Sequence, residues 1–115
     1  MVHQRIRKLK EQGILGTAYF KVDTLKLGFE TTAYTQIMLE DSKYHRKVGE
    51  ALRQIPEIVE CVNIAGRYAL MVKIHTRHNR HLRDVIYERI HTIEGVEGTN
   101  TTMVFETVFE RSLPI

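Results

Sequence analysis

The sequence has little of what stabilises secreted proteins or anchors membrane proteins. Its only cysteine is Cys61, so no internal disulfide can form. No apolar run is long enough to span a bilayer or to serve as the core of a signal peptide. Proline-rich, glycine/serine-rich and other low-complexity stretches are also lacking. These absences predict a cytoplasmic globular protein that has no membrane partner.

The length and the charge distribution predict one domain with a basic end. A chain of 115 residues is long enough to bury one core and too short for two full domains. Its formal net charge is +3, and the excess is uneven, because basic residues gather near the N-terminus and again between Arg77 and Arg83. A basic N-terminal segment is compatible with a nucleic-acid partner.

Hydrophobic periodicity predicts two elements before residue 28. Apolar side chains at helical spacing, followed by Gly13, predict a short basic helix over Val2–Gln12. Alternating apolar and polar residues over Thr17–Val22 predict a strand, and Leu25–Gly28 is typical of a turn.

The rest of the chain alternates between strand and helix patterns. Strands are predicted over Thr31–Leu39, Ile58–Ile64, Tyr68–His75 and Thr99–Val108. One helix is capped by Asp41 or Ser42 and ends before Pro56, and the apolar stripe of a second runs from Leu82 to Ile93. Only Ala65, Gly66 and Arg67 separate the two middle strands, which predicts an antiparallel hairpin.

This order of strand, helix, strand, strand, helix, strand is that of a ferredoxin-like domain. It predicts an α+β fold, βαββαβ, with two helices on one face of an antiparallel sheet, preceded by the short helix and strand. The other face would carry side chains too apolar to lie in water, namely Tyr34, Gln36, Met38, Ala69 and Met71. No element remains to cover this face, so we expect a second copy of the chain to cover it, as in a dimeric α+β barrel. The dimer contacts would then include Tyr34, Gln36, Met38 and Met71.

Three segments of the chain resemble the leucine-responsive and asparagine-synthesis regulators, the Lrp/AsnC transcription factors of bacteria and archaea. The stretch "RIRKLKEQGILG" from Arg5 is similar to the end of that family's DNA-recognition helix and the following turn. The stretch "IPEIVECVNIAGRYALMVKI" is similar to its strand, effector loop and strand. The stretch "IEGVEGTNTTMVFETV" is similar to its Gly-Val corner and Thr-x-Thr strand. The resemblance covers nearly the whole chain.

The resemblance implies a transcriptional regulator made of dimers that assemble further, for example into an octamer. It divides the chain into three parts. Residues 1–15 correspond to the last helix of a DNA-binding helix-turn-helix, and residues 16–28 form a connecting strand. Residues 29–115 form a ligand-binding and oligomerisation domain. Family members place a full helix-turn-helix before this domain, so DNA binding is expected only of a longer form. The residues expected at DNA in such a form are His3, Gln4, Arg5, Arg7 and Lys8.

The resemblance also implies an amino-acid effector near a dimer contact. Gly66 and Tyr68 match the family's Gly-x-aromatic-Asp loop, whose backbone groups can hold an α-carboxylate and an α-ammonium. The acidic residue of that pattern is Ala69 here, so we expect effector binding to be weakened, altered or absent. The predicted site comprises Ala65, Gly66, Arg67, Tyr68, Ala69, Thr99 and Thr101. Structural roles explain the same residues equally well, since Gly66 suits a tight turn and threonine is common in strands.

Other polar residues do not indicate catalysis or a metal. His75, His78 and His81 are three apart, but a strand end separates the first from the others and the intervening arginines repel a cation. Cys61 lies in a strand among apolar neighbours, where we expect a buried, neutral thiol. The sequence has no phosphate-binding glycine loop and no nucleophile elbow. We therefore predict a protein that is not an enzyme and has no metal and no cofactor.

The leading hypothesis is the effector-sensing and oligomerisation domain of an Lrp/AsnC-type transcriptional regulator. One alternative is a dimeric α+β barrel enzyme of the monooxygenase kind, which would enclose a polar pocket between sheet and helices. The helix stripes supply only Tyr44 for such a pocket. The other alternative is a standalone amino-acid sensor that never touches DNA.

Overall fold

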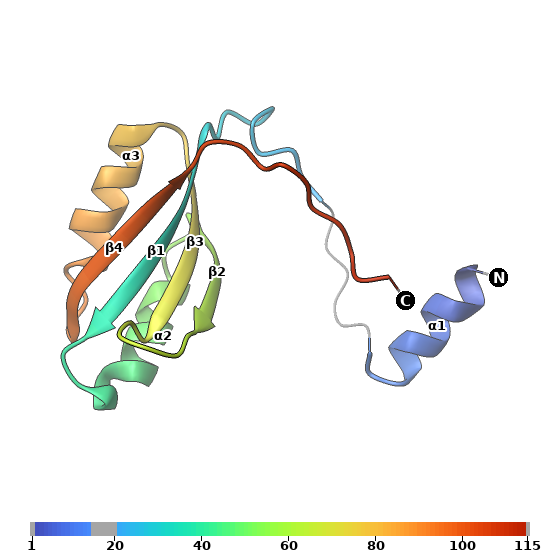
Figure 1. The fold of residues 1–115 in the computed structure, drawn as a ribbon, viewed down its shortest axis with the longest axis horizontal. Coiled ribbons are helices and arrows are strands. Elements are labelled where there is room, and N and C mark those ends of the chain that lie inside the picture. Colours follow the sequence, from blue (N-terminus) through green and yellow to red (C-terminus); the bar gives the residue numbers. More distant parts are fainter. Residues whose placement is uncertain (1, 15–20, 115) are drawn as a thin grey trace.

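The computed structural model describes residues 2–14 and 21–114, and its centre is one antiparallel sheet (Figure 1). The four strands lie in the order β2-β3-β1-β4. In chain order the elements are α1 (Val2–Glu11), β1 (Thr31–Leu39), the 3-10 helix η1 (Ser42–Tyr44), α2 (His45–Arg53), β2 (Ile58–Asn63), β3 (Leu70–Thr76), α3 (Asn79–Asp84), the π-helical continuation η2 (Val85–Ile90) and β4 (Val96–Val104). This is the ferredoxin-like α+β arrangement that the sequence predicts.

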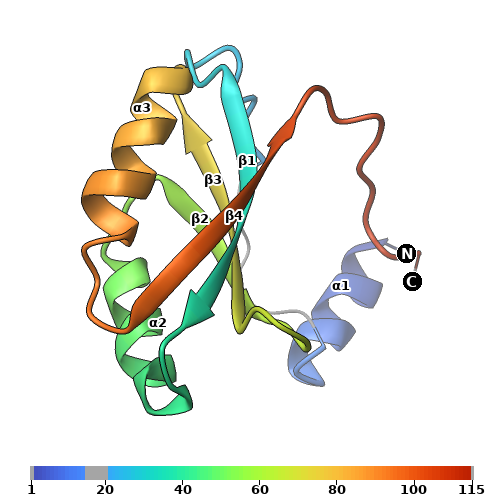
Figure 2. The ribbon, with the colours of Figure 1, turned by 60° about the vertical axis from the view of Figure 1, so that its left-hand side comes forward.

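The core lies between one face of the sheet and the two helical segments α2 and α3-η2 (Figure 2). Alternate residues of β1, among them Ala33 and Ile37, point into this core and are fully buried. The same alternation buries Leu70, Val72 and Ile74 of β3. From the helical side the buried residues are Val48, Leu52, Leu82, Val85, Ile86 and Ile90. Strand periodicity therefore decides which sheet face meets the helices.

A tight corner joins the end of β1, the start of α2 and the start of β4. Asp41 caps η1 by accepting a hydrogen bond from the backbone N–H of Lys43 at 2.9 Å. The N–H of Glu40 donates to the carbonyl of Gly95 at 2.8 Å. Gly95 has φ +98° and is buried against the Tyr44 side chain, which places a residue without a Cβ at the closest approach.

The last strand is displaced from its predicted position. The sequence predicts Thr99–Val108, whereas β4 runs from Val96 to Val104. It starts early because Val96 pairs with Leu39 across an irregularity in the ladder, and it stops where Val104 pairs with Thr32, close to the start of β1. Beyond Val104 no described strand of this chain continues the ladder, so the prediction was wrong at both ends.

Most of the predicted strand over Thr17–Val22 falls on residues 17–20, outside the described part of the chain. Lys21 and Val22 are described and do not form a strand. Among the described residues no backbone hydrogen bond joins these two to a neighbouring segment, and a strand needs such a partner.

The predicted N-terminal helix is confirmed as α1. The predicted turn is confirmed by the N–H of Gly28, which donates to the carbonyl of Leu25 at 3.0 Å. No helix in the described ranges is long and apolar enough to cross a membrane.

Candidate functional site

The β2–β3 hairpin carries most of the predicted effector residues on a loop longer than the sequence indicates. The ladder ends at the pair Asn63 and Leu70, so Tyr68, predicted to lie in a strand, lies in the loop. The N–H of Ile64 donates to the carbonyl of Ala69 at 3.0 Å and closes the loop. The N–H of Ala69 donates to the carbonyl of Ile37 at 3.0 Å, which ties the loop to the central strand β1. The predicted antiparallel pairing of β2 and β3 is confirmed.

A cleft of about 350 Å³ lies between this loop and the start of α2. Four of the predicted residues, Gly66, Arg67, Tyr68 and Ala69, line it, and Gly66 has φ +116°. Its remaining lining residues are Leu39, Ser42, His45, Asn63 and Ile64. Sequence reasoning missed Ser42 and His45, because only the sheet order brings the start of α2 over the hairpin. We name this space the hairpin cleft.

The two predicted threonines do not reach the hairpin cleft of their own chain. Thr99 pairs with Ile37, and Ile37 pairs with Leu70, so β1 separates β4 from the hairpin. Two strand spacings amount to about 10 Å. Thr101 Oγ1 lies 2.9 Å from Thr35 Oγ1, and Thr99 Oγ1 lies 2.7 Å from Nε2 of His91 at the end of η2. Both hydroxyls therefore have partners within the chain.

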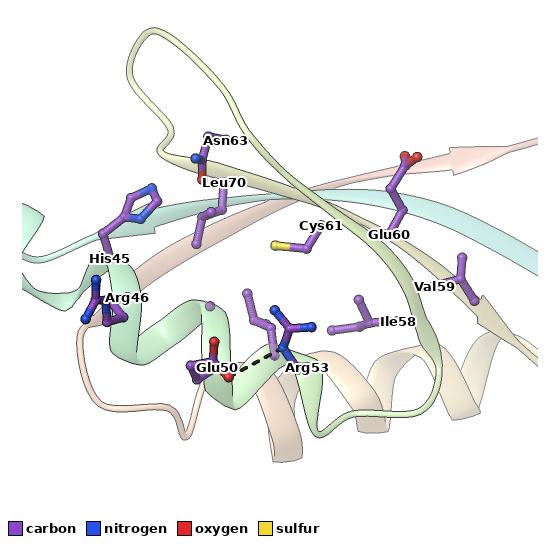
Figure 3. A pocket seen from close by; sticks show the side chains of 12 residues that line it. His45, Arg46, Glu50, Arg53, Ile58, Val59, Glu60, Cys61, Asn63 and Leu70 are labelled. Carbon is purple, nitrogen blue, oxygen red and sulfur yellow. Dashed lines mark ion pairs between the residues drawn. The ribbon is translucent and has the colours of Figure 1, made fainter. Parts of the chain in front are cut away.

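A second cleft, of about 400 Å³, adjoins the first between α2 and β2 (Figure 3). It shares His45 and Asn63 with the hairpin cleft. Cys61 lies in it, and the prediction that this cysteine is buried was wrong: the residue is exposed, because β2 is an edge strand. Its side chain lies in this cleft, where partial burial raises the pKa of the thiol against the opposing effect of Arg53 (Figure 3). A raised pKa agrees with the expected neutral thiol.

Among the described elements, no helix or strand covers the sheet face turned away from α2 and α3 (Figure 2). Residues 21–25 and 104–110 border part of this face, at a cleft of about 620 Å³ beside Tyr34 and Lys73. Tyr34, Gln36, Met38 and Met71, predicted at a dimer contact, are all partly exposed there. Beside them the Nδ1 atom of His75 lies 2.9 Å from Thr32 Oγ1. Partial burial and the Lys73 ammonium lower the pKa of His75. The C-terminal segment adds strongly exposed apolar side chains, Phe105, Val108, Phe109 and Leu113.

The three histidines predicted not to converge on a metal have separate structural partners. His78 caps α3 by accepting from the N–H of His81 at 3.1 Å. His81 Nδ1 accepts from the backbone N–H of Arg77, so its Nε2 carries the proton that is donated to Glu57 at 2.9 Å. Burial opposes ionisation of Glu57, but the hydrogen bonds from His81 and the backbone hold the pKa of the carboxyl below its usual value. Within the described ranges no cluster of three or more His, Cys, Asp or Glu side chains is placed to hold a metal ion.

The residues predicted at DNA lie on α1. Gln4, Arg5, Arg7 and Lys8 are exposed there, and the side chain of His3 lies outside the described residues. The first turn of α1 carries no acidic residue and the last turn carries Lys8 and Lys10.

Comparisons with known proteins agree on one family. Residues 32–114 match the family described as the Lrp/AsnC ligand binding domain. The HTH-type transcriptional regulator FL11 of Pyrococcus horikoshii is 36% identical over 115 residues, covering 99% of this chain and 75% of that protein. The structure of Escherichia coli AsnC matches with a TM-score of 0.88 at 26% identity, over 97% of this chain and 75% of that one.

A third similarity concerns the fold alone. The transcriptional regulator NMB0573 of Neisseria meningitidis, solved as a complex with L-Met, matches with a TM-score of 0.88 at 14% identity, over 98% of this chain and 75% of that one. From the family match and the identity to FL11 together, this chain belongs to the Lrp/AsnC family of transcriptional regulators, and residues 32–114 form its ligand-binding domain.

Proposed function

We propose that this domain binds an amino acid in the hairpin cleft and that binding biases how copies of the chain assemble. The observation that carries the proposal is the loop from Ile64 to Ala69, which two backbone hydrogen bonds anchor while its cleft stays open. A fixed loop presents its free backbone groups without an ordering cost at binding. If a ligand binds one arrangement of the copies more tightly than another, it shifts the equilibrium between the two arrangements by that difference in binding free energy.

The open sheet face is the proposed dimer contact. Met38 and Met71 lie on it, and a water-exposed face of this composition is unfavourable for a lone chain. A second copy offers a face of the same shape and composition, as a two-fold interface requires. The exposed Phe105 and Phe109 of the C-terminal segment extend the apolar surface available to that copy. Further association of dimers, for example into an octamer, is part of the proposal.

Thr99 and Thr101 take part only if another copy supplies them. Within one chain β1 stands between these threonines and the hairpin cleft. We propose that a neighbouring copy brings its β4 to the cleft, so that the bound ligand touches two chains. Ligand occupancy and assembly are then coupled through one site.

The N-terminal helix is the proposed link to DNA. The exposed Arg5, Arg7 and Lys8 on α1 suit contacts to phosphate and base edges. We propose that residues 1–15 end a DNA-reading helix and that residues 16–28 connect it to the ligand-binding domain at 29–115. We propose further that the regulator acts on DNA in the cytoplasm.

The enzyme alternative is not favoured by the packing. It needs a polar pocket enclosed between the sheet and its helices, but Ile37, Leu52 and Ile90 fill the centre of that space and are fully buried. The polar cleft between α2 and β2 is not enclosed, because it lies at the edge strand of the sheet. Tyr44, the single polar residue of the helix stripes, packs against Gly95. The relatives are transcriptional regulators.

The test measures the melting temperature and the sedimentation of the chain across the amino acids. We expect at least one amino acid to raise the melting temperature and to change the distribution of assemblies. A ligand at 100 times its Kd stabilises by about 2.7 kcal/mol, which is easily detected. A chain whose melting temperature and sedimentation respond to no amino acid would contradict the proposal.

A further inference from the structure

Among the described residues that line the hairpin cleft, the one with a permanent charge is the cationic Arg67. Among the other described lining residues, His45 presents an imidazole, Ser42 and Asn63 are neutral, and no carboxylate is present. Arg67 is exposed and forms no ion pair with a described residue. Its guanidinium is therefore free to form a charge-assisted hydrogen bond with a ligand.

In the adjoining cleft between α2 and β2, by comparison, positive and negative side chains occur in equal numbers. Arg46 and Arg53 line it together with Glu50 and Glu60. Arg53 Nε lies 3.4 Å from Glu50 Oε2, and Figure 3 shows this pair on the wall formed by α2. The excess positive charge is thus confined to the hairpin end of the joined clefts.

With this distribution of charge, we expect the hairpin cleft to bind amino acids of similar size with different affinities, according to the charge of their side chains. Every free amino acid brings one carboxylate and one ammonium, whose charges cancel. A cationic side chain would add a second ammonium beside Arg67, and none of the described lining residues has a carboxylate to pair with it. An anionic side chain would add a carboxylate that Arg67 or His45 can bind while the other holds the α-carboxylate.

We infer that the hairpin cleft selects a ligand with two carboxylates, an acidic amino acid, and that Arg67 determines this selectivity. The inference rests on the proposed function, since it names the ligand class of the same site. Ala69 fits this selectivity, because its methyl group adds no negative charge to the cleft.

The test is isothermal titration calorimetry of the full chain with four ligands: L-glutamate, L-glutamine, L-lysine and glutarate. L-glutamine has the shape of L-glutamate without the second charge, and glutarate has both carboxylates without the amine. We expect the Kd of L-glutamate to be about tenfold below that of L-glutamine, the size of one charge-assisted contact, with L-lysine weakest. Tight glutarate binding would also support the dicarboxylate selectivity, whereas the proposed amino-acid effector additionally requires L-glutamate to bind.

Two matched variants locate the effect. Arg67→Gln removes the charge from an exposed loop position, and Arg80→Gln removes the same charge from an exposed position on α3. We expect Arg67→Gln to raise the Kd of L-glutamate about tenfold and that of L-glutamine less than twofold, with Arg80→Gln close to wild type. Equal effects of the two variants, or L-glutamine or L-lysine binding as tightly as L-glutamate, would overturn the inference and leave the proposed function standing. Failure of L-glutamate to bind would also overturn the inference, whereas the proposed function falls only if no amino acid changes the melting temperature or the sedimentation.

Discussion

Substituting Gly95 by alanine tests the corner that holds the hairpin cleft in place. Gly95 has φ +98°, which costs an L-residue about 1–2 kcal/mol. An added Cβ would lie 2.7 Å from Cδ1 of Tyr44 and closer still to its Cγ, so the ring would have to move out of its packed position. Such a displacement costs about 1–3 kcal/mol of stability. Together these terms predict a loss of about 2–5 kcal/mol from a free energy of unfolding that is typically about 5–15 kcal/mol.

The assay is urea unfolding followed by circular dichroism, at one fixed protein concentration because association adds to stability. Gly49→Ala is the matched control, since Gly49 lies in α2 with nothing within 4 Å of an added Cβ. Alanine is the better helix former, so we expect this control to gain about 0.5–1 kcal/mol. A Gly95→Ala variant within about 0.5 kcal/mol of wild type would refute the steric reasoning.

The remaining predictions concern the open face, the core and pH. Met71→Lys puts a charge into both halves of a two-fold interface, so we expect the dimer Kd to rise about 100-fold or more by sedimentation velocity. Tyr87→Lys, at an exposed position of η2, should change it little, and equal effects would contradict the assigned interface. Ile37→Ala leaves a cavity at a fully buried position and should lower the free energy of unfolding by about 2–5 kcal/mol in urea titrations. An unchanged free energy of unfolding would show that Ile37 is not part of the core. Because the folded state lowers the pKa of His75, the unfolded chain binds the proton more readily, and the free energy of unfolding should fall as pH drops below 6.5. His75→Gln should flatten that decline, and an unchanged pH profile would exclude His75 as its source.

Local patterns in the sequence predicted the fold well. The alternation from Thr31 to Leu39 gave both bounds of β1 and the face that meets the helices. Asp41 was recognised as a helix cap and Gly66 as a turn residue with an unusual backbone angle. Each of these features depends on a few neighbouring residues, which a sequence displays directly.

Features that depend on distant residues could not be predicted in the same way. The bounds of β4 follow from where its partner β1 begins and ends, not from the residues of β4. Cys61 is exposed because the strand order puts β2 at an edge. Ser42 and His45 enter the candidate site because α2 starts above the hairpin. Recognising such residues needs the topology, which local patterns leave undetermined.

The most direct test of the account is sedimentation equilibrium of the wild-type chain over a wide concentration range. The open sheet face with Met38 and Met71 predicts a dimer or a multiple of dimers even at low micromolar concentration. A chain that remains monomeric at millimolar concentration would show that this face tolerates water, and it would contradict ligand control through assembly.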